Sequence, residues 1–224
     1  MKSENAKGMP LASRSKRVHW PLLLVLVLGA IGVAWFLATD AAVYLQYTRE
    51  KYTDYYWSRR PGLMVHVAAG ASALAVGLLQ VYLGLSGRAR FLHRLLGRVY
   101  LFAVFFGVAA AIYLAVTIPP GSPGYTSGLV GLGIAWSITT VMGYRRIIHR
   151  DVDGHRRWML RSYIVTFSFV SLRVIALIIA AFGWMSYDDA TSPAAWICWV
   201  LPLAVFEVGY RRFGWHRALQ SSPI

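Results

Sequence analysis

Six stretches of the chain are almost continuously apolar, and charged residues gather between them. A helix needs about 20 apolar residues to cross the roughly 30 Å of hydrocarbon in a bilayer. The pattern therefore predicts an all-α integral membrane bundle of about six transmembrane helices. The predicted spans are 21–38, 63–83, 99–117, 127–144, 163–184 and 194–210.

These spans divide the chain into three parts. We expect a basic cytoplasmic tail over 1–19, a six-helix transmembrane domain over 20–212 and a second cytoplasmic tail over 213–224. Within the domain, the four helices of 62–184 form the expected core.

Composition supports a membrane location. Hydrophobic residues make up 57% of the chain and charged residues 14%, against roughly 25% charged residues in an average soluble domain. A net charge of +14 is common among nucleic-acid-binding proteins, but here Lys and Arg lie between apolar runs. We therefore expect the lipid bilayer and anionic lipid headgroups at the cytoplasmic face as partners, and no nucleic acid.

The positions of Lys and Arg also predict the topology, because short cytoplasmic loops collect positive charge. Eighteen of these residues fall in the two tails and around the loops after the second and fourth spans, and four fall on the other side. This predicts a multi-pass protein of the cell (inner) membrane with both termini in the cytoplasm. The tyrosine-rich segment 40–60 is then external, either as an aromatic anchor at the headgroups or as a mobile lid.

Two similar segments carry the candidate chemistry, FLHRLLGRVYLF in the third span region and GHRRWMLRSYIV in the fifth. At 100° per residue, His93 shares a helix face with Gly97 and Tyr100, and His155 shares one with Ser162. Two histidines at one depth on parallel helices are what a six-coordinate haem b requires. Neighbouring residues expected to bind its propionates or ring are Arg94, Arg98, Arg156, Arg157, Arg161 and Tyr100. Alternatively, the histidines and arginines only mark a basic interface.

A second polar group is expected near the external side. His66 and Gln80 lie on one face of the second span, and Arg173 lies near the middle of the fifth. Such residues are costly in a membrane unless they face the protein interior or a cavity. This outer polar site could hold a quinone headgroup, an acidic small substrate, or only a hydrogen bond that locks two helices.

The cytoplasmic loop HRDVDGH alternates histidine and aspartate from His149 to His155. An extended loop could clip a divalent cation, whereas the ordinary interpretation is a turn with Asp capping the next helix. No phosphate-binding loop or nucleophile elbow is present in the sequence, so hydrolytic chemistry is not expected, and Cys198 is given no role.

The histidine motifs resemble a known family. HRLLGRVY at 93–100 and HRRWMLRSY at 155–163, with a histidine and a glutamine in the preceding span, resemble the bacterial multi-pass membrane family catalogued as domain of unknown function 2306, over roughly 60–184. More distantly, the motifs are similar to transmembrane b-type cytochromes and ferric-reductase-like proteins, which hold haem between bundle helices. Those proteins commonly carry two axial pairs, so the resemblance implies at most one haem here.

Three functions follow from these patterns, and whether the protein is an enzyme stays open. The first is electron transfer through one haem b on His93 and His155, to or from a quinone or another redox partner at the outer site. The second is a small-molecule or proton-coupled transporter whose polar cavity is lined by His66, Gln80 and Arg173. The third is a structural or accessory membrane subunit.

Overall fold

The computed structural model describes residues 20–87, 89–117 and 122–212, and these residues form helices and no strand. The elements are α1 (Trp20–Phe36), a π turn η1 (Leu37–Ala41), a 3₁₀ turn η2 (Ala42–Gln46), α2 (Arg49–Trp57), α3 (Arg60–Ser86), α4 (Arg90–Thr117), α5 (Pro123–Ile148), α6 (Val152–Thr166), α7 (Ser168–Ala181) and α8 (Tyr187–Arg212). Both predicted tails and Arg88 lie outside the described residues.

Five segments are each long and apolar enough to cross a membrane. They are Leu23–Gln46, α3, α4, α5 and α8, with mean hydropathy from 2.4 in α4 to 1.2 in α5. Helices α6 and α7 together supply a sixth span, bent by 44° where they meet. The predicted all-helical membrane bundle of about six spans is confirmed, while the side that the termini face stays a prediction from charge.

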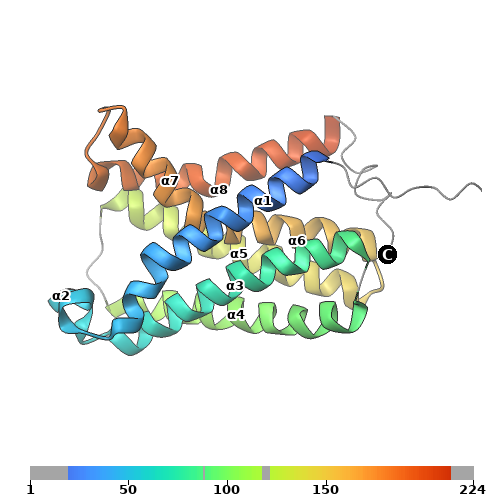
Figure 1. Cartoon of the computed structure of the whole chain (residues 1–224), viewed down its shortest axis with the longest axis horizontal. Helices are drawn as coiled ribbons and strands as arrows, with labels where there is room; N and C mark the ends of the chain where they lie inside the picture. Colours follow the sequence, from blue (N-terminus) through green and yellow to red (C-terminus); the bar gives the residue numbers. More distant parts are fainter. Residues whose placement is uncertain (1–19, 88, 118–121, 213–224) are drawn as a thin grey trace, which may run out of the picture.

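The helices run lengthwise past one another, with α3 packed along α4, and α5 along α6 and α8 (Figure 1). At one end, α3 leads into α4, α5 leads into α6, and α8 ends. We call this end the basic end because it carries Arg90, Arg94, Arg145 and Arg156. The opposite end carries α2 and the turn between α7 and α8.

Two helices begin well before the apolar stretches that predicted them. The predicted spans start at 99 and 163, whereas α4 starts at Arg90 and α6 at Val152. Hydropathy detects the part of a helix that suits hydrocarbon, whereas the arginine-rich N-terminal parts of α4 and α6 continue each helix into the headgroup layer. Both histidines of the candidate haem site lie on these extensions.

The predicted span 163–184 is not one straight helix. The chain bends at Phe167, between α6 and α7. Thr166 donates its hydroxyl hydrogen bond to the Ser162 carbonyl at 2.9 Å, and Ser171 donates to the Phe167 carbonyl at 3.3 Å. Hydroxyls that bond carbonyls four residues earlier compete with the backbone ladder and favour bending.

From Gly70 to Gly84, helix α3 carries a glycine at every seventh position, and each of these three receives a ring from another helix. The ring of Phe169 lies against Gly70, those of Tyr163 and Tyr100 against Gly77, and that of His93 against Gly84. A Cβ at Gly77 would lie 2.5 Å from the Tyr163 ring, too close for any side chain. Glycine thus lets α4, α6 and α7 insert rings into α3.

Candidate functional site

His93 and His155 lie at the basic end, on the first turns of α4 and α6. The His93 ring lies 3.4 Å from the position of a Cβ on Gly84, and its buried Nδ1 has no hydrogen-bond partner among the described residues. A buried polar atom without a hydrogen bond lowers the free energy of unfolding by about 1–3 kcal/mol. The Nδ1 atom of His93 is in this position.

His155 is held in a defined orientation. The Asp151 side chain caps α6 by accepting the Gly154 N–H at 2.8 Å, which starts the helix one turn before the histidine. His155 Nδ1 lies 2.9 Å from the Gly143 carbonyl on α5, and because a carbonyl can only accept, Nδ1 must carry the proton. In the neutral imidazole, Nε2 then keeps its lone pair. Histidines that bind metals are commonly held in this way.

His66, near the opposite end of α3, makes the same type of contact. Its Nδ1 donates to the Gly107 carbonyl on α4 at 3.1 Å, and its ring centroid lies 5.9 Å from that of Phe169. Two of the helix pairs, α3 with α4 and α5 with α6, are therefore joined by a histidine and a glycine carbonyl.

Arg173, on α7, forms an ion pair that the sequence analysis did not anticipate. Its Nε donates to Asp40 Oδ1 on η1 at 3.1 Å, and its guanidinium lies over the Phe36 ring at 5.4 Å. A charge at membrane depth is expected to find a partner, and an acid next to the first apolar stretch was the available signal.

A buried network of hydroxyls lies between the two ends. The Tyr100 hydroxyl is 2.7 Å from Ser162 Oγ and 2.8 Å from Thr166 Oγ1, and only 1% of Tyr100 is exposed. Trp136 donates to Thr166, and Thr140 shares a hydrogen bond with Ser162. Every member has a partner, so this network locks α4, α5 and α6 together.

Comparison with known proteins gives the family. A family model described as Predicted membrane protein (DUF2306) matches residues 63–209, well over half of the chain. The chain belongs to the DUF2306 family. No curated protein and no solved structure matches it.

The DUF2306 match begins inside α3 and ends inside α8. It therefore contains His66, His93, His155 and Arg173, whereas Asp40 lies before it. The match extends past the 184 that the motifs suggested, and it supports the resemblance stated from the sequence. Its description gives a membrane location and no activity.

Within this DUF2306 segment, the predicted haem-contacting residues separate into two groups. Arg94 and Arg98 are exposed beside His93, and Arg156 is half-buried beside His155. Arg161 instead pairs with Glu207 on α8, at 2.5 Å between Nε and Oε1, and stacks over Trp158 and Phe206. Arg161 lies on the side of α6 that faces α8, so its side chain reaches the Glu207 carboxylate.

The helix faces that carry the two histidines are largely covered by rings from the bundle. Trp136 fills the space at Gly107, with ring atoms 3.1 Å from a Cβ position, and Tyr100 covers Ser162. Gly97, one turn along α4 from His93, has only Gln80 Oε1 nearby, at 3.8 Å from a Cβ position. A Cβ at Gly97 would therefore make only this one ordinary contact with another helix among the described residues.

The predicted outer polar site of His66, Gln80 and Arg173 is not formed by these three residues together. Gln80 donates to the His93 carbonyl at 2.8 Å, so it belongs to the basic end. It lies 14 residues from His66 on one helix, about 21 Å along the axis. Gln80 therefore does not share a site with His66, and Arg173 pairs with Asp40 instead.

The loop before α6 forms the predicted turn and cap. Asp151 is the N-cap and pairs with Arg146 at 3.0 Å, and His149 is exposed at the end of α5. Among the described residues, no three His, Cys, Asp or Glu side chains gather as metal ligands. The pKa of Asp151 is lowered by the hydrogen bond from Gly154 N–H and by Arg146.

Proposed function

We propose that this membrane protein binds one b-type haem at its basic end, with His93 and His155 as the axial ligands, and serves in electron transfer. The observation that carries the proposal is that His93 and His155 lie on the first turns of α4 and α6 at the same end of the bundle, with His155 held through Nδ1 by the Gly143 carbonyl so that Nε2 keeps its lone pair. The haem iron would supply one-electron redox chemistry.

The residues around the two histidines suit such a group. Gly143 fixes His155 so that its Nε2 can bind a metal, a role that a backbone carbonyl often has around metal-binding histidines. Gln80 holds the first turn of α4 through the His93 carbonyl, and Gly97, one turn along α4, adds no side chain beside it. Arg94 directly follows His93, Arg98 directly follows Gly97, and both side chains are exposed. They can pair with two carboxylates at the edge of the ligand.

Absorption spectroscopy tests the proposal. The full-length protein, produced with added haem and purified in detergent, is expected to show a Soret band and dithionite-induced α and β bands at about one haem per chain. His93→Ala and His155→Ala are each expected to remove the six-coordinate spectrum. His149→Ala is the matched control, because His149 is at the same end but is exposed outside the pair.

Gel filtration of every variant separates loss of haem from loss of fold. Colourless wild-type protein that elutes as a folded species would overturn the proposal. So would a spectrum that survives unchanged in both alanine variants.

A further inference from the structure

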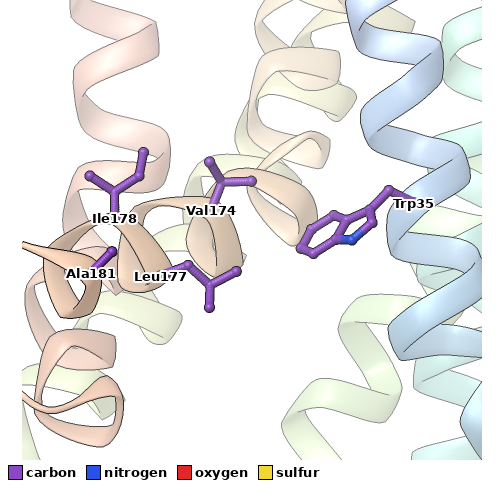
Figure 2. A pocket seen from close by; sticks show the side chains of 5 residues that line it. All are labelled: Trp35, Val174, Leu177, Ile178 and Ala181. Carbon is purple, nitrogen blue, oxygen red and sulfur yellow. The ribbon is translucent and has the colours of Figure 1, made fainter.

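A groove of about 300 Å³ lies between α1 and α7, and apolar side chains line it. Figure 2 shows Trp35 projecting from α1 toward α7, along which the other four lining residues are spaced. The lining residues are Trp35, Val174, Leu177, Ile178 and Ala181. A groove of this size and polarity suits a hydrocarbon chain, and its walls alone do not distinguish one lipid from another.

A polar group adjoins this groove. Arg173 directly precedes Val174 and lies one helical turn before Leu177, while Phe36, under the guanidinium, directly follows Trp35. Within the described residues, the guanidinium donates one hydrogen bond, from Nε to Asp40, and 34% of its side chain is exposed. Its terminal nitrogens can therefore donate to a ligand whose chain occupies the groove.

Charge decides which class of ligand suits this position. Asp40 already neutralises Arg173, so a lipid phosphate would place an uncompensated negative charge beside a carboxylate. A neutral carbonyl oxygen can accept from the guanidinium without that repulsion. The Trp35 ring, which lines the groove and is 36% exposed, offers apolar surface to a planar ring.

We propose that the groove and the Arg173–Asp40 pair bind a lipoquinone, with the isoprenoid chain between α1 and α7 and a ring carbonyl accepting a hydrogen bond from Arg173. This inference rests on the proposed electron-transfer function for its biological sense. The binding itself requires no haem.

Calorimetric titration of the full-length protein with decylubiquinone in detergent tests the site. Arg173→Gln is expected to weaken binding about tenfold, the effect of losing one charged hydrogen bond. Ala181→Trp fills the end of the groove and is expected to weaken binding by at least as much. Ala115→Trp, at an exposed alanine on α4 outside the groove, is the matched control and is expected to bind normally.

The Ala181→Trp and Ala115→Trp pair keeps the test decisive if Arg173→Gln does not fold. Equal affinity in these two variants would overturn the inference, and so would displacement of the quinone by dihexanoyl phosphatidylglycerol at equal concentration. Repeating the titration on His155→Ala separates the two proposals: binding there without a haem spectrum supports the quinone site alone, whereas a haem spectrum in the wild type without quinone binding rejects the quinone site alone.

Discussion

Away from the basic end, Arg173 is neutralised by Asp40, whereas at the basic end the buried Nδ1 of His93 makes no hydrogen bond. Polar groups in an apolar bundle need partners, and the two regions differ in whether the chain supplies one. Arg173 finds its partner within the chain. Among the described residues the buried Nδ1 of His93 has none.

The largest expected effect comes from breaking the ion pair. Asp40→Asn leaves Arg173 without a counter-charge and is expected to lower the free energy of unfolding by about 3 kcal/mol, at the lower end for buried pairs because both side chains are about one-third exposed. Unfolding in mixed micelles of dodecyl maltoside and dodecyl sulfate measures this. Asp54→Asn, in the exposed pair with Arg49, is the control, with less than about 1 kcal/mol expected. Equal effects would contradict the contrast.

The packing between the two ends gives the next effect. Gly77→Ala is expected to lower the free energy of unfolding by about 2 kcal/mol, because its Cβ would meet the Tyr163 and Tyr100 rings at 2.5 and 2.9 Å. Gly133→Ala is the control on α5, where a Cβ meets nothing within 4 Å, and a change within about 0.5 kcal/mol is expected. The same micelle unfolding assay compares them.

A pair of histidine variants sharpens the comparison directly. His66→Leu loses the hydrogen bond to Gly107 and is expected to destabilise the haem-free protein by about 1 kcal/mol. His93→Leu removes a nitrogen that has no partner, so the haem-free protein is expected to keep or slightly gain stability. Unfolding of both variants without haem checks this. A large loss in His93→Leu would mean that the imidazole already has a stabilising role in the chain alone.

The smallest effect concerns Asp151. Its pKa is lowered in the folded protein, chiefly by the Gly154 N–H, so its charge stabilises the fold fully above the unfolded-state pKa near 3.8. That contribution is lost as the pH falls through the lower, folded-state pKa. Asp151→Asn keeps a capping side chain that does not titrate. The stability difference between the two proteins is expected to shrink below about pH 4, and a constant difference would refute the assignment.

Hydropathy and charge predicted the number of spans, and the two histidine motifs predicted the family. All of these signals are properties of local sequence. The placing of His93 and His155 at one end followed from the same pattern, since each begins a helix after an arginine-rich turn. The 44° bend at Phe167 was missed because it depends on hydroxyl groups that hydropathy scales treat only as weakly polar.

Contacts between distant segments could not be predicted in this way. Arg173 and Asp40 are 133 residues apart, and nothing local indicates that η1 and α7 meet. Arg161 was expected near the haem propionates, and its ion pair with Glu207 was not predicted. That pairing depends on the packing of α8 beside α6, which local sequence does not show. Small residues on a face likewise indicate that something approaches, and rings of neighbouring helices filled most of that space.

The glycines at positions 70, 77 and 84 restrict how the bundle can change shape. Each receives a ring, from α7, from α6 and α4, and from the first turn of α4. Because successive residues of a helix are 100° apart, turning α3 about its axis would push bulkier side chains against the rings at all three glycines at once. We therefore expect α3 to tilt together with α4 and α6 as one rigid unit, without rotating about its own axis.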